Sequence, residues 1–307
     1  MAVSAIRIAS VCWLASALAW PGPASCARAA RADDAGALVH QALADDLALG
    51  QAVARAPDPS RPSEEIYPGI VQIPGSWYVT LVRQDDGVVV LDAPISAGYS
   101  RRVLEEAVRR FPGVPVKAVV ASTGFYWHIA GLREYAALGI PVYVRDRNES
   151  IVRQLLAAPH TLMPDRLALH PRAPIIHPVS SCVRIGEGRN AIELMPVRRG
   201  EQAMVMSWIP QANLLHTAEM VQPLGPGGAL LLPESLYEIA RSVQEAGIPT
   251  QGLRIIGMHM SPTPWRQVGE QLASGPTASP AARNPASVPA ATTVPAPAGC
   301  APAAAGR

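Results

Sequence analysis

Residues 116–131 read VKAVVASTGFYWHIAG, and this stretch decides the fold. Its first part, Val116 to Ala121, is a short apolar run of the kind that forms a strand buried on both faces of a sheet. We expect a helix over Ile129 to Leu138, ended by Gly139, and a further strand over residues 141–145. The stretch is therefore predicted to lie within a succession of strands and helices.

The same alternation extends to both sides of this stretch. Upstream, two β-rich runs, Trp77 to Val82 and Val88 to Asp92, flank an Asp-Gly pair and predict a hairpin, and an amphipathic helix follows over Arg101 to Phe111. Downstream we expect strands at 191–196, 204–209, 213–218 and 254–258, a helix at 233–246, and a short helix from Pro264 that Thr263 caps. Two such halves favour an α/β fold with sheets packed between helices.

Four positions in this order of strands and helices together resemble the pattern of one known superfamily. A strand ends in Asp92, the stretch Thr123 to Gly131 follows the buried strand, Glu219 follows a strand of the second half, and His259 ends the last strand. These landmarks resemble the metallo-β-lactamase superfamily, which has Thr-His-x-His-x-Asp-His-x-Gly-Gly at the second of them. The resemblance implies a four-layer αββα sandwich with a metal site at one edge of its two sheets.

The chain departs from the family at the residues that would form the first metal site. Thr123 and Phe125 stand where the family has its first two histidines, and Trp127 stands in place of the motif aspartate. The next family histidine falls at about Glu201. Because a phenylalanine cannot coordinate a metal, we expect that the first site is lost.

The second metal site that the resemblance implies is partly retained. It keeps His128, Glu219 and His259, and two imidazoles with one carboxylate are enough to hold one catalytic zinc with an open position, or one iron(II). Glu201, if it faces the same cleft, would be a fourth ligand or a general base. Strand alternation sends His216 and Glu219 to opposite faces, so His216 is expected to meet solvent or the other layer and not to be a ligand.

Two functions remain open at this point. The first is a mononuclear metal-dependent hydrolase of an ester, amide or phosphoester, in which the metal activates a water. The second is a catalytically inactive pseudo-hydrolase that binds a ligand or partner, with Thr123, Phe125 and Trp127 filling the former metal cavity and no metal bound. Either reading expects a small-molecule substrate or ligand, and the sequence does not identify it.

Residues 1–32 are predicted to be an export signal, because Arg7 precedes a 13-residue apolar stretch and an Ala-Arg-Ala pattern precedes Asp33. The stretch is shorter than the ~20 apolar residues that a membrane-spanning helix needs. We therefore expect a periplasmic or secreted protein without a transmembrane segment in the mature chain. Lipid attachment at Cys26 is the alternative.

Composition divides the rest of the chain. Residues 33–65 read as a small helix and a Pro-rich linker, residues 66–272 as one folded domain, and residues 273–307, mostly Ala, Pro, Ser and Thr, as a disordered tail. The mature chain keeps only Cys182 and Cys300, so a disulfide scaffold is not expected.

The charge is nearly balanced. The whole chain has 26 basic and 24 acidic residues, and loss of the signal removes three arginines and no acidic residue, which takes the net charge from +2 to −1. Nucleic acid is therefore not expected as a partner.

Overall fold

The structure, a computed structural model, describes residues 61–75, 77–197, 203–223, 229–230, 233–274 and 300–302. The predicted export signal and leading helix lie outside the described residues, as does most of the predicted tail. Within the described ranges, no helix is long and apolar enough to cross a membrane.

The described chain forms two seven-stranded sheets. The first sheet runs in chain order: β1 (Glu64–Tyr67), β2 (Ile70–Ile73), β3 (Val79–Arg83), β4 (Val88–Leu91), β5 (Val116–Ala121), β6 (Val142–Arg145) and β7 (Ile176–Val179). Its first four strands are antiparallel, and β4 to β7 are parallel. The predicted hairpin is β3–β4, and the predicted buried strand is β5.

The second sheet has the order β13-β12-β11-β10-β9-β8-β14. Its strands are β8 (Val183–Ile185), β9 (Ile192–Pro196), β10 (Val205–Ile209), β11 (Leu214–His216), β12 (Arg254–Gly257), β13 (Met260–Pro264) and β14 (Ala301–Pro302). The expected helix from Pro264 is wrong at its start, because Thr263 and Pro264 pair with β12 as part of β13. The helix begins two residues later, at Arg266.

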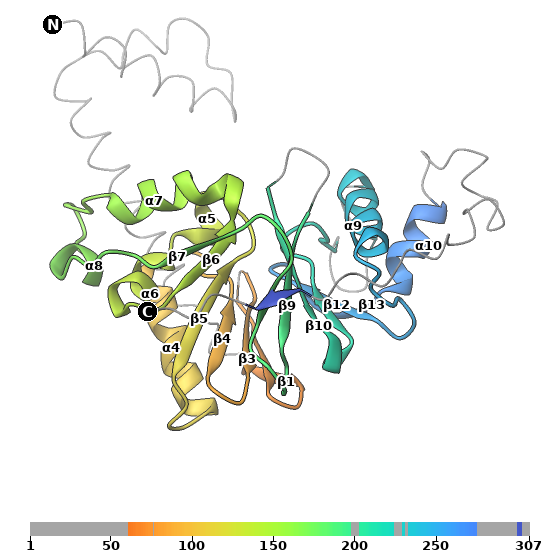
Figure 1. The fold of residues 1–307 in the computed structure, drawn as a ribbon, viewed down its shortest axis with the longest axis horizontal. Helices are drawn as coiled ribbons and strands as arrows, with labels where there is room; N and C mark the ends of the chain where they lie inside the picture. Colours follow the sequence, from red (N-terminus) through yellow and green to blue (C-terminus); the bar gives the residue numbers. More distant parts are fainter. Residues whose placement is uncertain are drawn as a thin grey trace, which may run out of the picture. The chain divides into compact units, whose positions relative to one another are not determined.

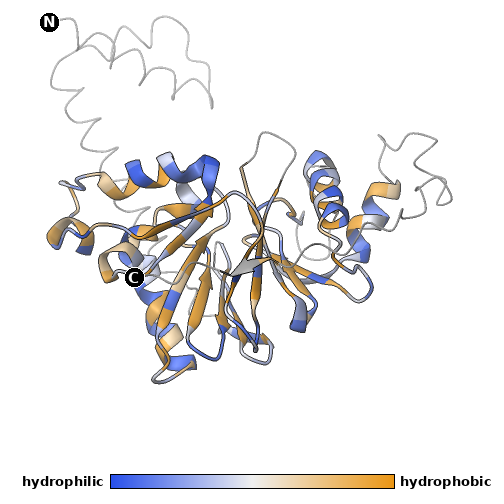
Figure 2. Ribbon diagram, in the orientation of Figure 1, coloured by the Kyte–Doolittle hydropathy of each residue, from blue (hydrophilic) through white to orange (hydrophobic). Residues whose placement is uncertain are grey.

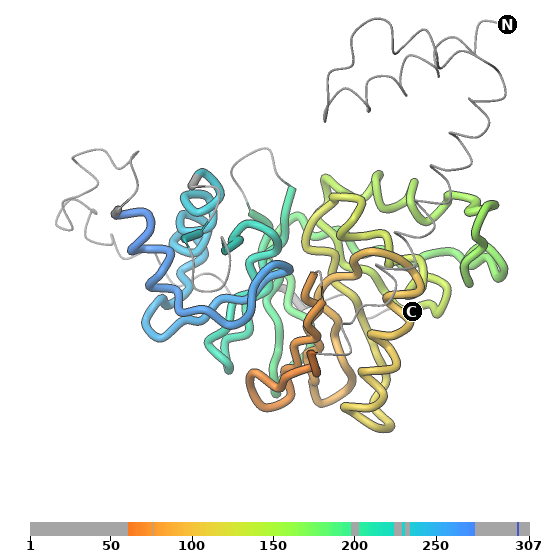
Figure 3. Tube along the Cα trace, turned by 180° about the vertical axis from the view of Figure 1, so that it is seen from behind, coloured from red at the N-terminus to blue at the C-terminus, as the bar shows by residue number. Residues whose placement is uncertain are grey.

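Helices cover the outer face of each sheet, as Figure 1 and the view from behind in Figure 3 show. The first sheet carries α4 (Ala97–Arg110), α5 (Tyr126–Ile129), α6 (Leu132–Leu138), α7 (Glu149–Ala157) and α8 (Arg166–Leu169). The second carries α9 (Pro233–Glu245) and α10 (Arg266–Ser274). Two short 3₁₀ turns, η1 (Asp146–Asn148) and η2 (Pro210–Ala212), complete the set of described helices.

Alternation of side chains along the strands builds the layers. Leu214 and Ile256 lie in the core between the two sheets, whereas their neighbours Leu215 and Ile255 lie in a second core under α9 and α10. The strands are apolar on both faces for this reason, which Figure 2 shows as hydrophobic strands between helices with hydrophilic outer sides. The fold is the predicted four-layer αββα sandwich.

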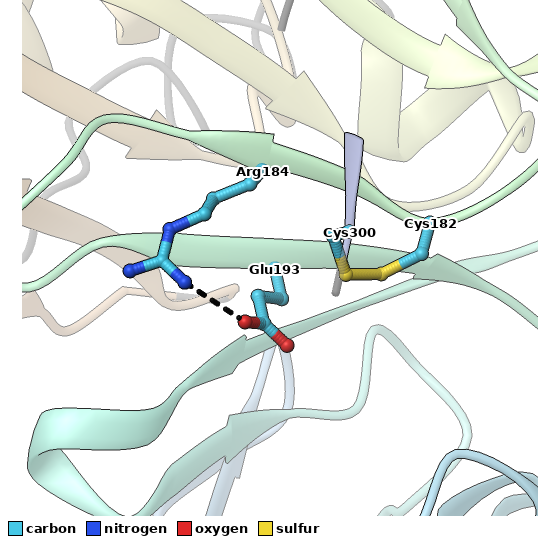
Figure 4. Close-up of a disulfide and its surroundings, with 4 residues drawn as sticks. All are labelled: Cys182, Arg184, Glu193 and Cys300. Carbon is cyan, nitrogen blue, oxygen red and sulfur yellow. Dashed lines mark hydrogen bonds and ion pairs between the residues drawn. A yellow bond between two sulfur atoms is a disulfide. The ribbon is translucent and has the colours of Figure 1, made fainter. Parts of the chain in front are cut away.

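The C-terminal residues that the structure describes belong to the second sheet. Cys300 forms a disulfide with Cys182 (Figure 4), and β14 pairs in parallel with β8 and forms the edge of the sheet. The sequence analysis, which addressed only a disulfide scaffold, did not predict this single bridge. Two cysteines cannot make a disulfide-rich scaffold, but one bridge can join a tail to a sheet edge, and composition gives no sign of it.

Candidate metal centre

His128 is placed by the turn that follows β5. The chain leaves the strand through Ser122 and Thr123 and enters the short helix α5, in which the backbone N–H of His128 donates to the Phe125 carbonyl at 2.9 Å. A Cβ at Gly124 would lie 2.6 Å from the Asn148 side chain, so only glycine fits this close approach. The His128 side chain is buried at the end of the first sheet.

Glu219 projects from the turn after β11. Ala218 has a positive φ of 56°, and the backbone N–H of Met220 donates to the Thr217 carbonyl, which closes the turn. One carboxylate oxygen of Glu219, Oε1, accepts a hydrogen bond of 3.1 Å from the Thr123 hydroxyl. Its other oxygen, Oε2, lies 3.2 Å from Nδ1 of His128. The carboxylate therefore joins the ends of the two sheets.

His259 lies in the turn between β12 and β13, and that turn is fixed against the same loop. The backbone N–H of Met258 donates to the Ala218 carbonyl at 3.0 Å, and the Met258 carbonyl accepts from Tyr78 N–H at 2.7 Å. At Gly257 a Cβ would lie 2.6 Å from the Ala218 carbonyl oxygen, so glycine is required for this approach. The turn brings the His259 ring to 5.6 Å from that of His128, between centroids.

The three predicted ligands of the second site thus meet. One ligand atom each from His128, Glu219 and His259 all lie within 4.8 Å of one another. Nδ1 of His128 and Nε2 of His259 are buried and make no hydrogen bond among the described residues. Buried polar atoms are normally satisfied, and the three ligand atoms lie close enough together that they could hold a metal ion. The donor set fits zinc or iron(II).

Burial sets the protonation of the three groups. It lowers the pKa of His128 to about 4, with the neighbouring His259 adding to the effect, and it lowers the pKa of His259. Burial raises the pKa of Glu219, and the hydrogen bond from Thr123 acts against this. Both imidazoles are therefore neutral at pH 7, which is the form that binds a metal.

Two of the residues that replace the first site, Phe125 and Trp127, are partly exposed at the edge of the candidate metal centre. Trp127 is half exposed, and its ring packs against Tyr126. Phe125 is also half exposed, with its ring centroid 5.3 Å from that of His128, and the indole edge of Trp77 covers another side of that imidazole at 5.6 Å. Glu201 lies outside the described residues.

Sequence reasoning missed a buried acid–histidine pair behind the site. Asp92 is fully buried with a φ of 72°, and its Oδ1 accepts from the Ser122 N–H at 2.9 Å. Its Oδ2 lies 3.3 Å from Nε2 of His216, whose Nδ1 accepts from the Ala218 N–H at 3.2 Å. His216 is not among the three converging side chains and meets the other sheet, as alternation predicted. The sequence offered one sign of this pair, because Asp92 is a charged residue at the end of an otherwise apolar strand.

The pair connects the two loops that carry the candidate ligands. Ser122 precedes Thr123, and Ala218 precedes Glu219, so the pair holds both loops through their backbone N–H groups. Burial raises the pKa of Asp92 to about 7 and lowers that of His216 to about 4. A single proton therefore belongs to the pair over this range of pH.

The fold of this chain matches solved metallo-β-lactamase structures. The metallo-beta-lactamase from Pontibacter korlensis has 15% identity and a TM-score of 0.52, with 69% of this chain and 97% of that chain covered. The DIM-1 metallo-beta-lactamase has 12% identity and a TM-score of 0.52, with 71% and 98% covered. The alkylsulfatase Pisa1 from Pseudomonas sp. has 17% identity and a TM-score of 0.48. That match covers 69% of this chain and 41% of the alkylsulfatase, so this chain spans less than half of the alkylsulfatase's length.

Sequence comparisons add nothing to this result. No protein-family model matches the chain, and no curated protein is similar to it in sequence. At such low identities the structural matches show the fold alone. The metallo-β-lactamase fold that the sequence resemblance implied is thereby confirmed.

Proposed function

On the metallo-β-lactamase fold of this chain, we propose an exported, mononuclear metal-dependent hydrolase that acts on an ester, amide or phosphoester. His128, Glu219 and His259 hold the metal. The observation that carries the proposal is the convergence of the buried His128 and the partly buried His259 on the Glu219 carboxylate, with one ligand atom from each residue within 4.8 Å of the others.

A divalent ion held by these residues would lower the pKa of a bound water and would polarise the carbonyl or phosphoryl oxygen of a substrate. The Thr123 hydroxyl donates a hydrogen bond to the Glu219 carboxylate and so holds this carboxylate in the orientation that faces the two histidines. The rings of Trp77 and Phe125 shield His128 from water on two sides. We assign the role of general base or fourth ligand to Glu201, from its place in the sequence.

Export is proposed from the apolar N-terminal stretch and gains support from the disulfide. Cys182 and Cys300 are bonded across two strands that pair, and such bridges persist in oxidising compartments such as the periplasm and the extracellular medium. A periplasmic or secreted location accounts for both observations.

Metal analysis of the purified mature protein tests the proposal. We expect about one equivalent of zinc or iron per chain by plasma mass spectrometry, and loss of this metal in a His128→Gln/His259→Gln double variant. The matched control is His170→Ala, which removes an exposed histidine and should retain the metal. Far-UV circular dichroism establishes that the double variant folds. Metal absent from both the parent and the double variant would favour the pseudo-hydrolase, in which the cleft binds a ligand without turnover.

A further inference from the structure

The disulfide at the edge of the second sheet has a carboxylate beside it. Cys300 comes directly before β14 and Cys182 directly before β8, and these two strands pair in parallel. Glu193 lies on β9, the other neighbour of β8. The two sulfur atoms and one carboxylate oxygen of Glu193 all lie within 4.8 Å of one another, as Figure 4 shows. Two sulfur atoms and an oxygen from three adjoining strands therefore meet at one place.

The strand pattern places these groups on the outer face of the sheet. Val183 packs into the core between the two sheets, so its neighbours Cys182 and Arg184 face the other way. Glu193 is paired with Arg184 on one side and with Trp208 on the other, and paired residues share a face. Cys182 and Trp208 are partly buried and pack against the core under α9 and α10. Apolar neighbours therefore shield the group from water on one side.

The charges of this group match those of a bound divalent cation. The Arg184 guanidinium lies 3.2 Å from one oxygen of Glu193, and both residues are partly buried. Once the bridge is reduced, the two cysteines bind a metal as thiolates, so together with Glu193 they carry three negative charges. Arg184 and a divalent cation supply three positive charges, and the site is then neutral. Without the cation the ionised group would keep an uncompensated negative charge, which is costly at a partly buried place.

The donor atoms and their spacing suit zinc. Zinc binds thiolate sulfur and carboxylate oxygen, and a water can take the fourth position of its tetrahedral shell. Zinc–sulfur bonds of about 2.3 Å at the tetrahedral angle place two sulfur atoms about 3.8 Å apart. Sulfur atoms joined in a disulfide are closer than this, so the two cysteine side chains must rotate apart after reduction. Their Cα atoms are 4.9 Å apart, and rotation about the Cα–Cβ bonds opens the sulfur separation without displacing the strands.

We propose that Cys182, Glu193 and Cys300 form a second metal site in the reduced protein, where one zinc ion ties the C-terminal residues to the sheet edge in place of the bridge. Reduction uses an external dithiol, which gives two electrons and two protons. The S–S bond of the protein breaks, two cysteine thiols form, and the dithiol closes into its own disulfide. Zinc then displaces the two thiol protons to the solvent. Oxidation by an external disulfide reverses both steps and releases the zinc. This site is independent of the hydrolase proposed above.

Cadmium titration tests the site in the mature protein, whose only cysteines are Cys182 and Cys300. The His128→Gln/His259→Gln variant serves as the background, because it lacks the candidate metal centre. After reduction with dithiothreitol and desalting under nitrogen, this protein should bind about one equivalent of cadmium and show the ultraviolet charge-transfer band of cadmium–thiolate bonds. Excess zinc should remove the band by competition. The same protein with its bridge intact should show no such band.

Glu193→Gln in the same background tests the carboxylate. Loss of a ligand should cost at least as much as loss of an outer-shell partner, so the cadmium dissociation constant should rise by about tenfold or more. Glu187→Gln, at an exposed glutamate in the turn between β8 and β9, is the matched control and should bind as the background does. Far-UV circular dichroism establishes that each protein is folded before and after reduction.

Two results would overturn the site: a reduced background protein without the cadmium band, and an affinity that Glu193→Gln leaves unchanged. A further measurement needs no substitution at the site. Zinc should slow the alkylation of Cys182 and Cys300 by iodoacetamide in the reduced background protein, because thiolates bound to zinc react more slowly than free ones. An unchanged alkylation rate would contradict the proposal even if the Glu193→Gln variant did not fold.

Discussion

The buried pair of Asp92 and His216 predicts opposite pH dependences of stability for two variants. In the folded protein, burial raises the pKa of Asp92 to about 7 and lowers the pKa of His216 to about 4, so the pair holds one proton between these values. In the unfolded chain, with ordinary values of 3.8 and 6.5, the pair also holds one proton over nearly the same range. From about pH 4 to 6.5 the pair therefore adds almost no pH dependence to the free energy of unfolding.

Replacing either member breaks this balance. In Asp92→Asn, the unfolded state binds one proton more than the folded state because only His216 titrates, so stability falls as the pH falls from 6.5 to 4. In His216→Asn, which can still accept from the Ala218 N–H, the folded state binds one proton more through Asp92. Stability then falls as the pH rises from 3.8 to 7. Each slope approaches about 1.4 kcal/mol per pH unit, the value for one proton.

Urea unfolding at several pH values between 4 and 7 measures these slopes as differences from the parent protein. Groups that do not interact with the pair titrate equally in all three proteins, so subtraction removes their contributions. Glu219 is not among them, because its charge contributes to the raised pKa of Asp92. The sign of the difference should be opposite in the two variants, whatever each substitution costs at a single pH. Two differences of the same sign, or two flat ones, would refute the assignment of a shared proton to Asp92 and His216.

Three further predictions concern stability and metal affinity. Cys182→Ser, or reduction of the parent, removes the bridge to Cys300 and should lower the free energy of unfolding by about 2–5 kcal/mol in urea, while the variant no longer responds to reductant. Thr123→Val removes the hydroxyl that donates to Glu219 and should weaken zinc affinity by about 10–100-fold in a chelator competition, with the fold unchanged by circular dichroism. Arg133→Met leaves the partly buried Asp165 carboxylate and three helix-end carbonyls without the Arg133 guanidinium, so the urea midpoint should fall by the equivalent of about 1.5–3 kcal/mol.

The sequence predicts best the elements whose burial pattern is simple. Strand β5 has the bounds that its apolar run indicates, and Gly139 ends α6 with the expected left-handed φ of 74°. The predicted helix start at Pro264 was wrong for a physical reason. A Thr-Pro pair is typical of a helix start, but it also fits an edge strand, where proline's lack of an N–H group leaves no hydrogen bond unmade. Local sequence alone does not distinguish these two uses.

Long-range partners were beyond reasoning from local pattern. The sequence analysis expected His216 to meet solvent or the other layer, and His216 does contact the other sheet, but local pattern could not identify Asp92 as its partner there. The bridge from Cys182 to the C-terminal residues was missed for the same reason, since neither spacing nor composition reports that a tail returns to a sheet edge. The meeting of His128, Glu219 and His259 was expected only through the resemblance to a known superfamily.

The structure gives new roles to two residues that replace metal ligands in the first site. Thr123 is buried and donates to Glu219, so it orients a candidate ligand of the second site, whereas the resemblance implies a ligand of the first site at this position. Phe125 lines a cavity that Glu219 also lines, and it packs against His128, so it contributes apolar surface at a position that no longer needs a donor atom. If these substitutions had merely followed loss of function, Thr123→Val would leave zinc affinity unchanged. The hydroxyl's hydrogen bond to a candidate ligand is the reason to expect otherwise.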